Sequence, residues 1–166
     1  MLIVFDNMHD GSRVWVYTAE RDLNEEESRI ANDLGYDFVT QWTAHSRDLT
    51  AGFTVIENRF IVLSVDETMQ GASGCSIDSS VNFVRSLEDK LGISMLNGGK
   101  VAVQIEGSIA LLTTTEIKKL AAEGNFGVDN IMYDHLVTNL GDLRNHFKKR
   151  SGDSWLKGFI PQAETA

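Results

Sequence analysis

The side chains best suited to chemistry fall in two short stretches of the sequence, residues 43–50 and 66–78. Together these stretches hold several carboxylates, one histidine and the single cysteine of the chain: His45, Asp48, Asp66, Glu67, Cys75 and Asp78. Cys75 precedes an apolar helical pattern, so its thiol would lie at a helix N-terminus, where free amides and the helix dipole favour a thiolate. With His45 as the base and Asp66 to orient the imidazole, these residues would form a thiol-dependent catalytic site.

A non-catalytic interpretation of the same residues stays open. Cys75 would then be a small buried hydrophobe, and Ser76 or Asp78 would only cap the helix. The carboxylates also oppose activation, because negative charge near a thiol raises its pKa and repels an anionic ligand. Trp42 continues an apolar helical stripe, which predicts a place in the core, with stacking on a ligand as the alternative. The candidates for binding rather than catalysis are Glu67, Asp78, Ser76 and Trp42.

The sequence predicts neither a metal site nor a cofactor. Asp66 and Glu67 at a strand end would suit a hard cation, but a single imidazole is nearby, and carboxylates in such places commonly cap turns. A single cysteine excludes an internal disulfide and any CxxC pair. The other histidines are scattered without ligand spacing: His9, His135 and His146.

Changes in hydrophobic period predict the elements that position these residues. Alternation predicts strands, and apolar residues three or four apart predict helices. A capping box is expected at Asn24 and Glu27, and Gly92 is expected to end the second helix. In chain order we expect a strand at 13–18, a helix at 24–41, strands at 51–57 and 59–66, a helix at 77–91 and a strand at 100–105.

This order, βαββαβ, is the split βαβ or ferredoxin-like arrangement of an α+β protein. It predicts an antiparallel sheet with strands in the order 4-1-3-2 and both helices on one face. Residues 93–96 could pair instead of 101–105, or together with them, as the fourth strand. Because the first helix returns to the end where the first strand began, the loops 43–50 and 66–78 should meet at one end of the sheet.

Residues 1–99 are predicted to form a ferredoxin-like core, and residues 100–166 an extension packed on it. If 101–105 is the last strand of the sheet, the core extends to residue 105. The basic run 148–150 would be the solvated end of the last helix. The apolar tail at 155–160 should dock on the body, since an exposed apolar segment is a liability. The expected elements of the extension are a hairpin from 100 to 113, a helix at 115–123 ended by Gly124, a strand near 131–133 and a helix near 140–149.

Four strings resemble an uncharacterised bacterial protein family whose members are sometimes labelled "ABC transporter ATPase": WTAHSRDL (42–49), RFIVLSVDE (59–67), ASGCSIDSSV (72–81) and DSWLKGF (153–159). The resemblance covers nearly the whole chain, and the family has no established activity that it could imply. A Walker A loop needs GxxxxGK[ST] between a strand and a helix. Before Gly99-Lys100, Ser94 stands in place of the first glycine, and Val101 replaces the hydroxyl residue. The sequence therefore predicts no nucleotide hydrolysis.

Residues 101–143 are also similar to small GYF-type peptide-binding modules. The similarity lies in the order of a hairpin, the helical string TEIKKLAAEGNF, a short strand and a short helix. It implies a shape for this part of the chain rather than a function.

Charge and composition limit the partners. A net charge of -9 and a pI of 4.8 oppose phosphate backbones and anionic lipids, so we expect neither nucleic acid nor a membrane as a partner. The acidic start MLIVFDNMHDG lacks the basic region of a signal peptide, and no apolar run reaches the ~20 residues of a membrane span, which favours a cytoplasmic protein.

The expected function is that of a non-catalytic binding or interaction module. Its partner would be another protein or a second copy of the chain. A sheet with helices on one face needs cover on the other, either from the C-terminal hairpin and tail or from a second chain, and a dimer is slightly favoured over a monomer. The alternatives are a thiol-dependent enzyme or redox sensor that uses Cys75 with His45, and a small-molecule binder at the same loops.

Overall fold

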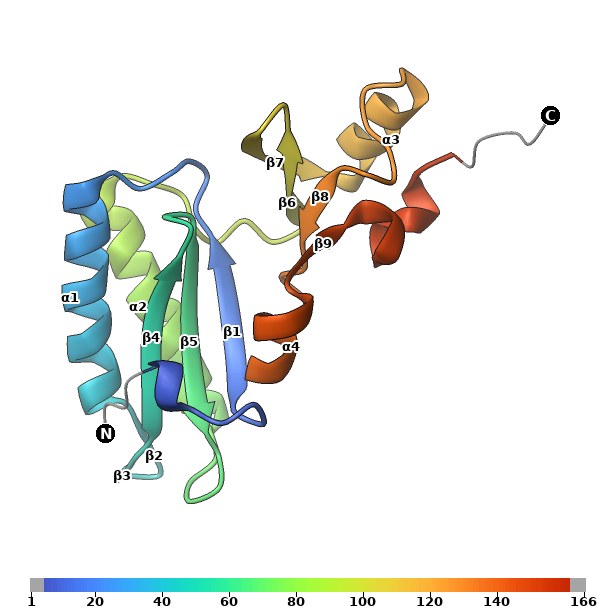
Figure 1. Cartoon of the computed structure of the whole chain (residues 1–166). Coiled ribbons are helices and arrows are strands. Elements are labelled where there is room, and N and C mark those ends of the chain that lie inside the picture. The colour runs from blue at the N-terminus through green and yellow to red at the C-terminus, as the bar shows by residue number, and fades with distance from the viewer. Residues whose placement is uncertain (1–4, 162–166) are drawn as a thin grey trace. The chain divides into compact units, whose positions relative to one another are not determined.

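The computed structural model describes residues 5–161, which divide into two compact units (Figure 1). Unit 1 comprises the chain up to Asn97 together with Leu136–Arg144, and unit 2 comprises Gly98–His135 and the chain from Asn145 onward. Residues 136–144, which the sequence places in the extension, therefore belong to unit 1. Both units combine helices with antiparallel strands, which confirms the predicted α+β class.

Unit 1 is built on a three-stranded antiparallel sheet in the order β1-β5-β4. The first and third predicted strands are neighbours as expected, with Trp15 opposite Leu63. Two very short strands, β2 and β3, form a small hairpin just before β4. The bounds are β1 (Arg13–Thr18), β2 (Thr43–Ala44), β3 (Arg47–Asp48), β4 (Thr50–Ile56) and β5 (Phe60–Asp66).

The helices α1 (Glu25–Gln41) and α2 (Gly74–Leu91) begin and end at capping residues. The capping box predicted for α1 is present, because the Asn24 side chain accepts from the Glu27 amide and the Glu27 carboxylate accepts from the Asn24 amide. Gly92 ends α2 in the left-handed conformation with φ of 66°, as the sequence predicts.

Both helices share one core with the same face of the sheet. Trp15, Leu63 and Phe53 lie opposite one another on neighbouring strands and point into this core, where Phe83 of α2 joins them. Gly35 of α1 makes the closest approach to the sheet, since a Cβ atom built on it would lie 2.3 Å from the Phe53 ring. The helix therefore needs a residue without a side chain at this position.

The other face of the sheet is also buried, at Val14, Phe60 and Val62. A short 3-10 helix, η1 (Phe5–Asn7), contacts β4. At the β1 edge the Val14 amide donates to the Thr138 carbonyl over 3.0 Å. An open sheet face was the physical reason for expecting a dimer, so this reason does not hold, and the oligomeric state stays a prediction.

The predicted fourth strand of the sheet is wrong. β6 (Lys100–Ile105) is a strand, but both of its edges pair with strands of unit 2. The edge of β1 that it would have joined is bonded to residues 138–139 instead. The alternative segment 93–96 is not a strand either: the Ser94 carbonyl accepts from the Glu20 amide over 2.9 Å, beside the loop that follows β1.

Unit 2 contains a four-stranded antiparallel sheet in the order β7-β6-β8-β9. The predicted hairpin is present, with Ile105 opposite Ser108 and a two-residue turn whose φ angles are 51° at Glu106 and 81° at Gly107. Buried Ile117 and Leu156 join Val103 in a second core, so the apolar tail docks within this unit as expected. The bounds are β7 (Ser108–Thr113), α3 (Thr114–Ala122), β8 (Ile131–Tyr133), β9 (Lys148–Arg150), η2 (Ser151–Asp153) and η3 (Trp155–Phe159). The helix α4 (Leu140–His146) belongs to unit 1 as far as Arg144.

The basic run 148–150 is not the end of a helix, because α4 stops at His146 and the run forms strand β9. In this strand the Lys148 ammonium lies over the Tyr133 ring, 5.7 Å from its centroid, and the other two cations form ion pairs. Lys149 forms an ion pair with Asp134 at 3.1 Å, and Arg150 forms one with Asp129 at 2.6 Å. Within residues 5–161, no helix has the length and apolar character needed to cross a membrane.

Candidate functional site at one end of unit 1

Antiparallel pairing brings the two predicted loops to the same end of the unit 1 sheet. Thr50, the first residue of β4, lies opposite Asp66, the last residue of β5. The β2–β3 hairpin leads into β4, and the segment after β5 leads into α2, so both leave the sheet at this end (Figure 1). We call the surface formed by residues 43–50 and 66–78 the loop end. It brings His45 and Cys75 to one end of the unit, as the topology argument expects.

The β2–β3 hairpin has a buried base and an exposed tip. Trp42, Ala44 and Leu49 are at most 2% exposed, and the Leu49 amide donates to the Trp42 carbonyl over 2.9 Å. The tip residues His45 and Ser46 are both exposed and both left-handed, with φ of 51° and 64°. Two positive φ angles are typical of a type I′ turn, which favours Asn-Gly, so His-Ser is an unfavourable pair for this backbone.

The segment between β5 and α2 is held by its two carboxylates. Asp66 accepts from the Thr68 hydroxyl at 2.7 Å and from the Thr68 amide at 3.0 Å, and it forms an ion pair with His9 at 3.0 Å. The hydrogen bonds from Thr68, helped by His9, lower the pKa of Asp66 below its usual value. Glu67 accepts from the Ala72 amide at 2.8 Å, which closes the loop.

Between these anchors, Met69 projects into solvent with 84% of its surface exposed. Among the described residues, three other large apolar side chains are exposed by 42–60%, so Met69 is the most exposed of these four. A flexible thioether side chain suits contact with varied apolar surfaces. The loop end thus carries an apolar contact point that sequence reasoning missed.

α2 begins three residues earlier than predicted, with Ser73 as its N-cap; of the two predicted capping residues, Ser76 takes part in the cap and Asp78 does not. The Ser73 side chain accepts from the Ser76 amide, and the Ser76 hydroxyl accepts from the Ser73 amide, which completes a capping box. Asp78 is exposed and lies beyond this cap. Cys75 stands in the first turn with its side chain exposed, so it is not the buried hydrophobe of the non-catalytic interpretation.

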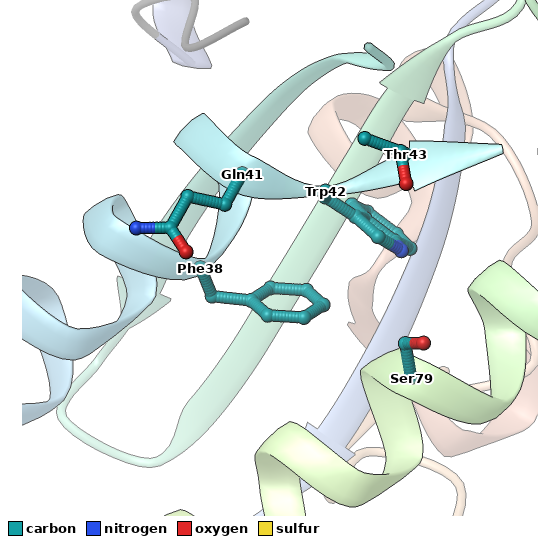
Figure 2. A pocket seen from close by; sticks show the side chains of 5 residues that line it. All are labelled: Phe38, Gln41, Trp42, Thr43 and Ser79. Atoms are coloured by element: carbon teal, nitrogen blue, oxygen red, sulfur yellow. The ribbon is translucent and has the colours of Figure 1, made fainter. Parts of the chain in front are cut away.

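A small pocket lies where the hairpin base meets the first turns of α2 (Figure 2). Its volume is about 240 Å³, and it is lined by Phe38, Gln41, Trp42, Thr43 and Ser79. The Trp42 indole N–H donates to the buried Ser76 carbonyl over 2.8 Å, which fixes the indole across the two helices. Trp42 is thus a core residue, as predicted, that also forms a wall of this pocket.

The candidate catalytic residues share the loop end without forming a hydrogen-bonded chain. In the described residues, no hydrogen bond joins His45 to Cys75, and Asp66 is bonded to Thr68 and His9 rather than to His45. No group of three or more residues among those described is placed to hold a metal ion. The candidate binding residues differ: Glu67 and Ser76 are used in local hydrogen bonds, whereas Trp42 lines the pocket.

Sequence reasoning missed His9, Ser79 and Phe38 as parts of this end. Helical spacing could have indicated two of them, because Phe38 lies one turn before Trp42 and Ser79 one turn after Cys75. The Ser79 hydroxyl donates to the Cys75 carbonyl over 3.0 Å. His9 lies far from Asp66 in sequence, so no local pattern could have paired them.

Comparison with known proteins identifies no relative: no protein-family model, no curated protein and no solved structure matches this chain.

Proposed function

We propose that the protein is a non-catalytic binding module that contacts a protein partner through the loop end of unit 1. The observation that carries the proposal is the strained hairpin tip at His45 and Ser46. Left-handed backbone is costly for residues with a Cβ atom, about 1–2 kcal/mol each, and such strain is kept where it serves a function. Neither residue makes a hydrogen bond or ion pair within residues 5–161, so the described chain offers no internal compensation.

A second hairpin of unit 1, formed by β4 and β5, shows what internal compensation looks like. Glu57 and Asn58, at the opposite end of β4 and β5, are also left-handed, with φ of 51° and 54°. Their turn is packed into the unit: the Asn58 carbonyl accepts from the Leu23 amide at 2.7 Å, and the Arg59 guanidinium donates to the Ala19 carbonyl at 2.7 Å. Bonds from residues outside the hairpin thus support that turn, whereas among the described residues the tip at His45 and Ser46 is supported by the pairing of β2 with β3 alone.

The partner we propose is a protein, because the tip, the exposed Met69 and the small pocket form a spread surface rather than one deep cavity. A second copy of the chain meets this description as well as a different protein does. Sedimentation at high micromolar concentration separates the two, since a particle of 18.4 kDa would exclude self-association.

For unit 1 we propose a split βαβ arrangement that lacks its fourth strand.

Selection of peptides from a displayed random library tests the proposal. The double substitution His45→Asn with Ser46→Gly removes the imidazole and the hydroxyl of the tip and supplies the pair that this turn favours, so the fold should be retained. We expect it to weaken most selected peptides at least tenfold. The matched control, Glu57→Asn with Asn58→Gly, makes the same change at the opposite end and should leave binding intact. Peptides that respond equally to both variants would refute the proposal.

A thiol-dependent enzyme or redox sensor that uses Cys75 with His45 is the second candidate. It is favoured by one observation, the exposure of Cys75 in the first turn of a long helix. The rate of alkylation of Cys75 distinguishes this candidate from a binding module.

A further inference from the structure

The sulfur atoms of the protein are divided between the core and the loop end. Among residues 5–161, three methionines have at most 4% of their surface exposed: Met8, Met95 and Met132. The other two sulfur-bearing residues in this range, Met69 and Cys75, are exposed and both belong to the loop end. An oxidant arriving from solvent therefore meets sulfur first on the surface that we propose binds the partner.

Met69 is presented by a turn that does not depend on its side chain. Asp66 accepts two hydrogen bonds from Thr68, and Glu67 accepts one from the Ala72 amide across the turn. With 84% of its surface exposed, Met69 contributes little to packing. A chemical change at its sulfur should therefore alter the surface of the loop end without unfolding unit 1.

The chemical change open to an exposed thioether is oxidation to the sulfoxide. With hydrogen peroxide, a sulfur–oxygen bond forms as the O–O bond breaks, so the thioether is oxidised and the peroxide is reduced to water. Because hydrogen peroxide is uncharged, the carboxylates of the loop end do not repel it. The product is a polar side chain in place of a flexible apolar one.

We propose that Met69 is a redox switch of the loop end, whose oxidation to the sulfoxide by hydrogen peroxide weakens binding of the partner. The proposal rests on the proposed function, because it treats Met69 as an apolar contact with the partner. That contact loses its water when the partner binds, and a sulfoxide oxygen buried without a hydrogen-bond donor is unfavourable. A methionine sulfoxide reductase reverses the change: its dithiol is oxidised to a disulfide, and the oxygen leaves as water.

Peptide mapping by mass spectrometry tests the selectivity of the oxidation. In native protein treated with peroxide, Met69 should gain oxygen about ten times faster or more than the buried methionines, because the fold shields them. Unfolding in urea should remove this difference. Equal rates at Met69 and the buried methionines in the native protein would overturn the proposal.

The effect on binding is measured with peptides from the displayed library that lose affinity for the His45→Asn, Ser46→Gly variant. After peroxide is removed, we expect these peptides to bind about tenfold more weakly or less. Dithiothreitol should not restore binding, whereas methionine sulfoxide reductase should. Dithiothreitol reduces a sulfenic acid or disulfide at Cys75 and leaves methionine sulfoxide intact, so restoration by dithiothreitol alone would assign the effect to Cys75 and overturn the proposal.

Two substitutions of Met69 provide matched variants. Met69→Leu keeps an apolar side chain without sulfur, and Met69→Gln supplies a polar side chain in place of the sulfoxide. Whatever its own affinity, Met69→Leu should bind equally before and after peroxide, whereas Met69→Gln should bind about as weakly as the oxidised wild type. Loss of binding by peroxide-treated Met69→Leu would overturn the proposal.

Urea denaturation separates a switch from damage to the core. The urea midpoint of the wild type should be the same before and after peroxide, because the buried methionines stay reduced. A loss of binding accompanied by a lower midpoint would overturn the proposal.

The switch and the proposed function fail in different ways. Peptides that depend on the hairpin tip but bind the oxidised protein unchanged would reject the switch and leave the loop end as the binding surface. A selection that yields no tip-dependent peptide would reject the proposed function, and the switch with it.

Discussion

Replacing Gly35 with alanine tests how tightly α1 is seated on the sheet of unit 1. A Cβ atom at this position would lie 2.3, 2.4 and 2.5 Å from three carbons of the Phe53 ring. Carbon atoms in contact prefer about 3.5–4.0 Å, so either the ring or the helix must move by more than 1 Å. Phe53 is 2% exposed and packs edge-to-face against Phe83 at 6.0 Å, so the ring has little room to move.

The expected loss follows from two opposing effects. Inserting a methyl group into a packed core costs about 1–3 kcal/mol. Alanine is a better helix residue than glycine by about 1 kcal/mol, which offsets part of this cost. Because the ring is confined, we take the upper part of the range and expect Gly35→Ala to lower the free energy of unfolding by about 2 kcal/mol.

Urea denaturation followed by circular dichroism measures this loss. Gly74→Ala is the control, because a Cβ atom there meets nothing within 4 Å and the residue lies in the first turn of α2. The control should be as stable as the wild type or more stable by about 0.5 kcal/mol. A Gly35→Ala protein as stable as its parent would refute the packing of α1 on Phe53.

Three further predictions concern other parts of unit 1. Hydrogen bonds from Arg21, with a smaller contribution from the Asn24 amide, lower the pKa of Glu27 to about 2. Because this pKa is lower in the folded state than in the unfolded state, the stability that Glu27 contributes is complete above pH 4.5 and is lost as the pH falls toward 2. The urea midpoint of Arg21→Ala should therefore lie below that of the wild type at pH 6, and the gap should close by pH 2. Ser46→Gly should raise the free energy of unfolding by about 1 kcal/mol, because glycine adopts the left-handed conformation without strain. Native Cys75 should react with iodoacetamide at pH 7 at about the rate of free cysteine, since it is exposed and makes no hydrogen bond to His45.

Each of these has a clear contrary result. A difference in urea midpoint between Arg21→Ala and the wild type that stays constant from pH 6 to pH 2 would contradict the role of Glu27. The control is Arg47→Ala, because Arg47 is exposed and has no ion pair among the described residues. Asn58→Gly should gain less than Ser46→Gly, because asparagine tolerates the left-handed region; an equal gain would argue against strain at Ser46. Alkylation of Cys75 ten times faster than free cysteine would favour the thiol-dependent alternative.

Much of unit 1 could be predicted because its signals are local. The periodicity of α1, its capping box at Asn24 and Glu27, and the stop at Gly92 each depend on residues within a few positions of one another. The loop end followed from connectivity alone, since antiparallel pairing of β4 with β5 requires Thr50 and Asp66 to meet.

The features that could not be predicted depend on which of several distant segments pairs with a given strand or packs on a given helix. Nothing near Val101 shows that β7 and β8 will occupy both edges of β6, or that Thr138 will bond to Val14 in its place. The run 148–150 was mistaken for a helix end because three basic residues carry no period, whereas pairing with β8 makes it a strand. The pocket joins Phe38 to Ser79 across two helices, and one sequence does not reveal which faces meet.

Photo-crosslinking in living cells of the source organism tests the central claim most directly. Benzoylphenylalanine would replace Met69 at the loop end in one protein and Glu57 at the opposite end of the sheet in another. We predict a discrete protein adduct from position 69 that is lost when His45→Asn and Ser46→Gly are added, and no such adduct from position 57. Adducts that form equally at both positions, or only at position 57, would contradict the loop end as the binding surface.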